Sequence, residues 1–181
     1  MRLFIGIDFN QETIELIDIA IKRIQSTAEK GRFVRPDMLH LTVEFLGEVE
    51  PERGKSLEDV IDELKFKPFS IKPITFGTFK RREGDILWMG LEESKELQEL
   101  WRELHCLLLA SGFKLEVRPY IPHVTLGRKV KLPTEFNDLE CTLAQNMPYT
   151  LVERIHLFHS TSENGPLEYR KIYSGRAQSD N

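Results

Sequence analysis

The sequence predicts an α+β fold of two pseudo-symmetric lobes, with antiparallel sheets and flanking helices around a central cleft that carries two H-x-T motifs. Three observations predict this fold. Strand-like and helix-like segments are mixed along the chain, hairpin-like turns separate several of the strands, and a strand–helix–strand order occurs twice with nearly the same length. The length of 181 residues, with 40% hydrophobic and 30% charged residues, suits one globular domain that spans residues 1–181.

The first strand–helix–strand unit covers about residues 1–50. Residues 2–8 have the composition of a strand, and Asn10 is a suitable N-cap for a helix whose isoleucines keep helical spacing as far as Gly31. Residues 39–45 then alternate apolar and polar side chains with a period of two, which is typical of a half-buried strand. We therefore expect this second strand to turn one face to the core.

The second unit covers about residues 84–130 and repeats this order. Residues 86–91 have the composition of a strand, a stripe of leucines at helical spacing follows, and Gly112 is placed to end that helix. The string V-R-P-x-x-x-H-x-T occurs in both units, at residues 34–42 and 117–125. Five identities in the same frame of two matching units indicate an internal duplication.

Further elements are expected outside the two units. Residues 51–64 have the pattern of an amphipathic helix, and a turn is expected at residues 164–166. Strands are expected at residues 69–79, 151–160 and 167–173.

Each H-x-T motif places an imidazole beside a hydroxyl. Side chains two residues apart on a strand point to the same face, so His40 lies beside Thr42, and His123 lies beside Thr125. Duplicated units commonly pack about a pseudo-two-fold axis. Such packing would bring the two pairs to opposite sides of a cleft.

Two histidines on opposite sides of a cleft suit a displacement at phosphorus. The attacking water needs a base and the leaving oxygen needs an acid, and histidine serves either role because its ordinary pKa is about 6.5. Thr42 and Thr125 can donate hydrogen bonds to the non-bridging phosphate oxygens, and Arg128 can add a charge-assisted contact. This chemistry, with His40 and His123 as the catalytic residues, needs no metal ion and no cofactor.

Several other polar residues fit structural roles as well as functional ones. Arg35 and Arg118, which precede the two motif strands, are either structural anchors or substrate contacts. Tyr120 either stacks on a base or covers the core. The basic turn at residues 80–84 is either a solvated hairpin tip or a surface that attracts an RNA end.

The remaining histidines and the cysteines show no metal-binding or redox pattern. His156 and His159 are three apart in a predicted strand and therefore point to opposite faces, and His105 is expected to lie solvated on a helix. Cys106 and Cys141 form no C-x-x-C pair, so we expect two buried free thiols rather than a disulfide or a zinc site.

Composition limits the possible partners. The formal net charge of -4 argues against a protein that tracks along nucleic acid through many Lys and Arg contacts, but it allows a small pocket for one phosphate. No apolar stretch approaches the ~20 residues of a membrane span, and the N-terminus lacks the pattern of a signal peptide. We therefore expect a cytoplasmic monomer with no membrane partner.

The motif residues resemble those of the 2H phosphoesterase superfamily, whose signature is two H-x-[TS]-x motifs, present here at residues 40–43 and 123–126. The closer resemblance is to RNA 2',3'-cyclic phosphodiesterases, often labelled 2'-5' RNA ligases. It rests on R-L-F-I at residues 2–5, L-H-L-T-V-E-F-L-G-E-V at residues 39–49, L-W-M-G at residues 87–90 and P-H-V-T-L-G-R at residues 122–128.

This resemblance implies a bilobal fold, no cofactor, and hydrolysis of a 2',3'-cyclic phosphate, on an RNA end or a cyclic nucleotide, to a 2'-phosphate. In the scheme that it implies, His123 activates water and His40 protonates the leaving 3' oxygen. Pseudo-symmetry allows these two roles to be exchanged. A weaker joining of RNA ends through a 2'-5' linkage is implied for the same site.

Three alternative functions also fit the motifs. The site could act on a small nucleotide, such as an ADP-ribose cyclic phosphate or a 2'-5' oligonucleotide. The chain could instead be an RNA-end binding module without turnover, or a metal-dependent phosphodiesterase. Intact histidine and threonine in both motifs argue against a module that only binds, because binding alone needs neither a base nor an acid.

Overall fold

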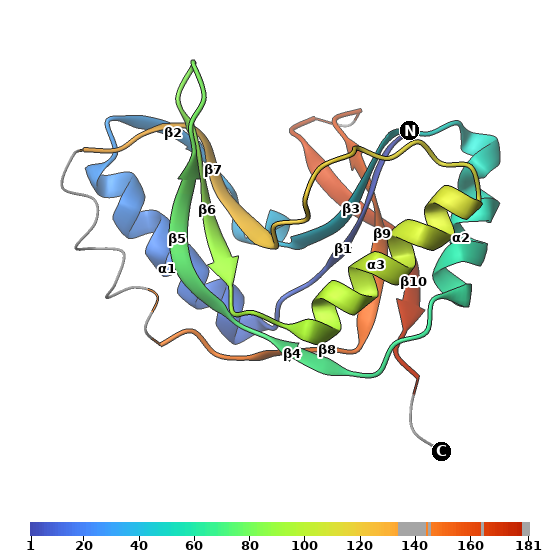
Figure 1. Ribbon diagram of the computed structural model, residues 1–181. Coiled ribbons are helices and arrows are strands. Elements are labelled where there is room, and N and C mark those ends of the chain that lie inside the picture. The colour runs from blue at the N-terminus through green and yellow to red at the C-terminus, as the bar shows by residue number, and fades with distance from the viewer. Residues whose placement is uncertain (134–143, 145, 164, 179–181) are drawn as a thin grey trace.

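A computed structural model describes residues 1–133, 144, 146–163 and 165–178 of the chain. Within this part it forms three helices and ten strands, and Figure 1 shows their arrangement. The helices are α1 (Gln11–Thr27), α2 (Gly54–Glu63) and α3 (Lys95–Ala110). The strands are β1 (Arg2–Ile7), β2 (Lys30–Phe33), β3 (Leu41–Glu48), β4 (Phe69–Ile71), β5 (Pro73–Phe79), β6 (Asp85–Leu91), β7 (His123–Lys131), β8 (Thr150–Val152), β9 (Arg154–Thr161) and β10 (Glu168–Arg176).

Two four-stranded sheets form the two lobes. The first sheet has the strand order β10-β9-β1-β3, the second has the order β2-β7-β6-β5, and β4 pairs with β8 in a separate ribbon. Every pairing between the described strands is antiparallel. Strands β3 and β7 contact each other and diverge from the middle of the molecule into opposite lobes (Figure 1). The predicted α+β fold with antiparallel sheets and flanking helices is therefore confirmed.

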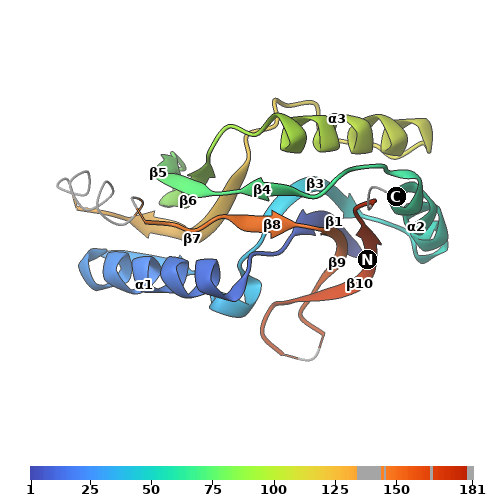
Figure 2. The same ribbon diagram turned by 90° about the horizontal axis from the view of Figure 1, so that it is seen from below.

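The two long helices cross between the lobes. Helix α1 follows β1 of the first sheet but lies against β2 of the second, whereas α3 follows β6 of the second sheet but lies against β3 of the first. Figure 2 shows α1 and α3 on opposite sides of the strands. Each helix buries one apolar stripe, which is the expected behaviour of an amphipathic helix on a sheet. Both stripes belong to one continuous hydrophobic core.

Local signals in the sequence explain where the helices begin and end. Asn10 caps α1 as predicted, because its side-chain Oδ1 accepts a hydrogen bond of 2.8 Å from the Thr13 amide. Ser94 Oγ caps α3 in the same way, at 3.1 Å from the Leu97 amide. Gly112, with a φ of 76°, follows α3 in the left-handed conformation that glycine adopts at low cost.

Several predicted boundaries were wrong. Helix α1 ends at Thr27 rather than near Gly31, because Lys30–Phe33 form the unpredicted strand β2. The predicted helix at residues 51–64 begins with a separate 3-10 turn at Pro51–Arg53. Strand β3 begins one residue after His40. The predicted turn at residues 164–166 lies partly outside the described residues, because Asn164 is not among them.

Candidate active site

The two motif histidines lie at the starts of the two diverging strands. His123 is the first residue of β7, and His40 immediately precedes β3. Thr42 and Thr125 follow within those strands, and both are half-buried. Because β3 and β7 contact each other, the fold brings the two sequence motifs together from opposite lobes.

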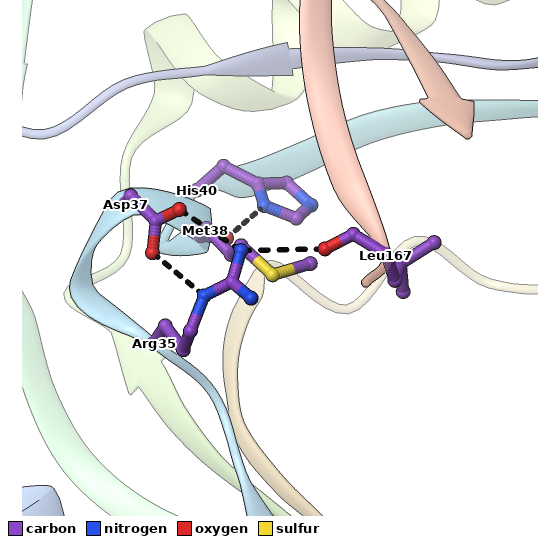
Figure 3. A network of polar contacts seen from close by, with 5 residues as sticks. All are labelled: Arg35, Asp37, Met38, His40 and Leu167. Atoms are coloured by element: carbon purple, nitrogen blue, oxygen red, sulfur yellow. Dashed lines mark hydrogen bonds and ion pairs between the residues drawn. The ribbon is translucent and has the colours of Figure 1, made fainter. Parts of the chain in front are cut away.

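The two imidazoles are held in the same way. His40 Nδ1 donates to the backbone carbonyl of Met38 at 2.7 Å (Figure 3), and His123 Nδ1 donates to that of Ile121 at 2.7 Å. A carbonyl oxygen only accepts, so Nδ1 carries the proton in both rings. In the neutral tautomer, Nε2 is therefore the nitrogen that can accept a proton.

The threonines differ in their contacts. Thr42 Oγ1 lies 3.1 Å from His40 Nε2 and can donate to it when the ring is neutral. The Thr125 hydroxyl has no hydrogen-bond partner within the described part of the chain. The local chemistry of the two motifs is thus similar but not identical.

Aromatic side chains fix both rings from the sides. Phe4 lies 4.7 Å from the His40 ring centroid, and Tyr169 meets that ring edge-on at 5.0 Å. Phe79 meets the His123 ring edge-on at 5.1 Å. Such packing limits ring rotation and removes water from one side of each imidazole.

Burial lowers the pKa of both histidines below the ordinary value. For His40, the bond to the Met38 carbonyl and the charge of Asp8 oppose this effect, while the charges of Arg128 and His123 add to it. For His123, burial is again the main cause, and nearby arginines, including Arg128, lower the pKa further. Both rings are therefore mainly neutral at pH 7, and they lie within electrostatic reach of each other.

Arg128 reaches the site because β7 contains a bulge. Strict alternation would send a side chain five residues after His123 to the opposite face. However, neighbouring β6 residues pair with Thr125 and Gly127, which are two apart, and Leu126 and Gly127 are both buried. The bulge returns the exposed Arg128 to the face of His123 and Thr125, which agrees with its effect on both histidines.

A pocket of about 290 Å³ opens beside His40. Its walls come from the segment between β1 and α1, the start of α1, the turn before β3, and strands β9 and β10, and they include Asp8, Phe9, Tyr169 and Lys171. His123 does not line this pocket. This pocket therefore contains only one of the two motif histidines, and the predicted cleft that carries both motifs stays a prediction.

The two arginines of the repeated V-R-P string differ in their contacts. Arg35 holds Asp37 through two hydrogen bonds and donates to the backbone carbonyl of Leu167 at 3.3 Å (Figure 3). Arg118 forms an exposed ion pair of 2.9 Å with Glu116. The repeated string therefore does not lie in matching environments, although the histidines that follow it do.

Two predictions about the region around α3 were wrong or only half complete. His105 is not solvated, because its Nδ1 lies 2.7 Å from Oε2 of the buried Glu44. Tyr120 covers the core: it stacks on Trp101 with centroids 5.2 Å apart, and its hydroxyl donates to the Thr42 carbonyl at 3.2 Å. A contact between residues 61 positions apart leaves no signal in local periodicity.

The remaining predictions for polar residues have mixed outcomes. Cys106 is exposed rather than buried, because it lies on the outer side of α3, and Cys141 lies outside the described residues. His156 is buried in β9, where Nδ1 lies 2.8 Å from Ser174 Oγ and Nε2 lies 3.3 Å from Asp8 Oδ2. Across residues 1–133, 144, 146–163 and 165–178, no three His, Cys, Asp or Glu side chains are grouped to hold a metal ion.

Comparisons with known proteins connect this geometry with one family. The model of the 2'-5' RNA ligase superfamily matches residues 15–164. An RNA 2',3'-cyclic phosphodiesterase of Thermotoga maritima is 30% identical over 177 residues, which cover 96% of this chain and 94% of that protein. The RNA 2',3'-cyclic phosphodiesterase of Escherichia coli is 34% identical over 128 residues, 70% of this chain and 71% of that protein. The crystal structure of E. coli LigT complexed with 3'-AMP matches with a TM-score of 0.79 at 25% identity, covering 98% of both chains.

Proposed function

This chain belongs to the 2'-5' RNA ligase superfamily, and we propose that it opens the 2',3'-cyclic phosphate at the end of an RNA to give a 2'-phosphate. The observation that carries the proposal is the shared arrangement of His40 and His123. In both rings Nδ1 is tied to a backbone carbonyl, which leaves two Nε2 atoms for proton transfer. The names of the relatives supply the substrate class.

Hydrolysis divides the proton transfers between the two rings. Nε2 of His123 accepts a proton from water as the water oxygen bonds to phosphorus. Nε2 of protonated His40 donates a proton to O3' as the bond between phosphorus and O3' breaks. His40 must therefore be charged when substrate is bound, and the negative cyclic phosphate favours that charge by raising the pKa of His40.

The phosphate oxygens need donors while this exchange occurs. Thr42 and Thr125 stand beside the two rings and can donate to the non-bridging oxygens. Arg128 adds a charge-assisted contact from β7. Donors fixed in advance by a folded strand pay little reorganisation energy in the transition state.

The proposal includes the setting of the reaction. We propose that residues 1–181 act as one bilobal domain, as a monomer, in the cytoplasm, on RNA and without a metal ion. None of the described helices is long and apolar enough to span a membrane. The same site can join RNA ends when a 5' hydroxyl takes the place of water: O5' bonds to phosphorus, the bond between phosphorus and O3' breaks with protonation of O3', and a 2'-5' linkage results.

The first test is hydrolysis of an RNA oligonucleotide with a 2',3'-cyclic phosphate end, measured in the presence of a chelator. The wild type is compared with His40→Asn, His123→Asn and the matched control His159→Asn. Each motif variant should lose about 10²–10⁴-fold in rate, because each removes one proton transfer. The control should retain full activity, and the product should be the 2' isomer.

The outcomes separate this proposal from the alternatives. Turnover of a small nucleotide cyclic phosphate in clear preference to the RNA would replace the substrate class. Binding of the RNA without product would indicate a module that only binds RNA ends. Loss of activity in chelator, with recovery on adding a divalent metal, would indicate a metal-dependent enzyme.

A further inference from the structure

Arg32 and Arg128 stand directly opposite each other on neighbouring strands. Arg32 of β2 is the register partner of Arg128 of β7, and both side chains are exposed. Directly opposed residues of antiparallel strands project from the same face, with Cβ atoms about 4.5–5.5 Å apart. Arg32 therefore shares the face on which Arg128 approaches the histidines.

No acidic side chain among the described residues forms an ion pair with either of these two arginines. Neither guanidinium has an ion pair or a hydrogen bond within the described part of the chain. The adjacent Lys129, in contrast, is paired with Glu83 at 2.5 Å. Like charges at directly opposed positions are destabilising, so the pair costs folding free energy unless an anion lies between or above the two groups.

The position of the pair suggests which anion this is. Arg128 lowers the pKa of both His40 and His123, so its charge lies at the reaction centre. Arg32 lies one strand farther out, because β2 is the outer strand of the second sheet and β7 is its neighbour (Figure 1). An anion held by Arg32 therefore lies next to the scissile phosphate, on the β2 side of Arg128.

We propose that Arg32 binds the phosphodiester that links the terminal nucleotide to the preceding nucleotide, while Arg128 binds the terminal cyclic phosphate. This inference rests on the proposed function and deepens it, because it defines the substrate as an RNA strand rather than a free nucleotide. A nucleoside cyclic phosphate carries one phosphate and leaves Arg32 unused. An RNA end carries a second negative charge one nucleotide away and neutralises both arginines.

The test compares substrates that differ in the second charge. The first is a nucleoside 2',3'-cyclic phosphate, the second is a dinucleotide with the same cyclic end, and the third is that dinucleotide with a neutral methylphosphonate linkage. An ADP-ribose cyclic phosphate is the fourth, because its diphosphate offers similar chemistry from another source. Wild type, Arg32→Gln and the exposed control Arg23→Gln are measured with each substrate, after unfolding curves show that all are folded.

We expect Arg32→Gln to lower kcat/KM for the charged dinucleotide about tenfold more than for the nucleoside cyclic phosphate. On the methylphosphonate dinucleotide, which lacks the second charge, the wild type should have no such advantage in kcat/KM over Arg32→Gln. The slope of log kcat/KM against log salt concentration should become shallower by about 0.7 for the charged dinucleotide, as expected for the loss of one phosphate contact to a single strand. Arg23→Gln should behave as the wild type with every substrate.

The results distinguish this inference from the proposed function. Equal losses on all substrates, or none, would overturn the role of Arg32 while leaving the phosphodiesterase activity in place. A larger loss on the ADP-ribose cyclic phosphate than on the dinucleotide would overturn RNA as the source of the second phosphate. Binding of a dinucleotide that ends in a 2'-phosphate, measured by calorimetry, tests the contact without turnover: equal affinity for wild type and Arg32→Gln would refute it.

Discussion

The hydroxyl of Tyr120 ties the loop before β7 to strand β3, and removing it should loosen the histidine on that loop. The hydroxyl donates to the Thr42 carbonyl at 3.2 Å. His123 stands three residues later in the chain, and its ring is held by the carbonyl of the intervening Ile121. The substitution Tyr120→Phe deletes this one tie and keeps the stacking of the ring on Trp101.

The expected effect follows from one hydrogen bond of a largely buried group. Burial raises the pKa of Tyr120, so the hydroxyl stays protonated and donates throughout the working pH range. Loss of such a bond costs about 0.5–1.5 kcal/mol of unfolding free energy. In a domain of this size, 1 kcal/mol corresponds to a Tm lower by about 2–4 °C.

Catalysis should suffer more than stability. Small displacements of a catalytic group are costly, so we expect kcat to fall about tenfold with little change in KM. Urea unfolding and steady-state kinetics on a cyclic-phosphate oligonucleotide measure the two effects. Tyr149→Phe, which removes an exposed hydroxyl bonded to Glu92 at 2.8 Å, is the control and should change neither. Wild-type kcat in Tyr120→Phe would refute the role of this tie.

Three further predictions concern protonation and packing. Burial, with a contribution from Arg128, lowers the pKa of His40 and His123, so a plot of kcat/KM against pH should peak below pH 6.5. Because Arg128→Gln removes one cause of the lowered pKa values, it should move both limbs of that plot to higher pH. An unmoved profile would contradict this origin of the shifts. The two histidine rings take up protons near pH 6.5 in the unfolded chain and only at lower pH in the folded chain. The two neutral rings therefore contribute fully to the free energy of unfolding above pH 6.5, and this contribution is lost as the pH falls toward the folded-state pKa. Urea unfolding at about pH 5 and 7.5 would detect the difference. Gly77→Ala places a Cβ 2.2 Å from the indole ring of Trp88, which lies beside His123, and should lower the free energy of unfolding in urea by about 1–3 kcal/mol. The control Gly54→Ala, with nothing within 4 Å of the new Cβ, should leave that free energy unchanged.

Local patterns predicted the parts of the site that depend on short-range chemistry. The placement of His40 beside Thr42 at the start of β3, the cap at Asn10 and the helix stop at Gly112 each depend on only a few neighbouring residues. A helical or period-two pattern therefore contains the information needed to place them. The catalytic roles proposed for the motif residues remain predictions that the kinetic tests address.

Other features depend on contacts that no local pattern records. Strand β2 has almost no buried face, so its sequence carries no alternation, and it exists because its backbone pairs with β7. Alternation alone places Arg128 on the wrong face, because the bulge at residues 126–127 becomes visible only in the register with β6. The hydrogen bond between His105 and Glu44 joins α3 to β3 and could not be inferred from either element alone.

The crossing of α1 and α3 between the lobes has a consequence for how the chain can be divided and assembled. Helix α1 leaves the ribosome before β2, the strand of the second sheet that it contacts, and β2 in turn has no neighbour in its sheet until β7 has been made. A cut between the two halves would leave α1 and β2 without β7, the strand on which β2 pairs, and would separate α3 from β3. We therefore expect neither half to fold when expressed alone, and the intact chain to unfold in a single cooperative transition.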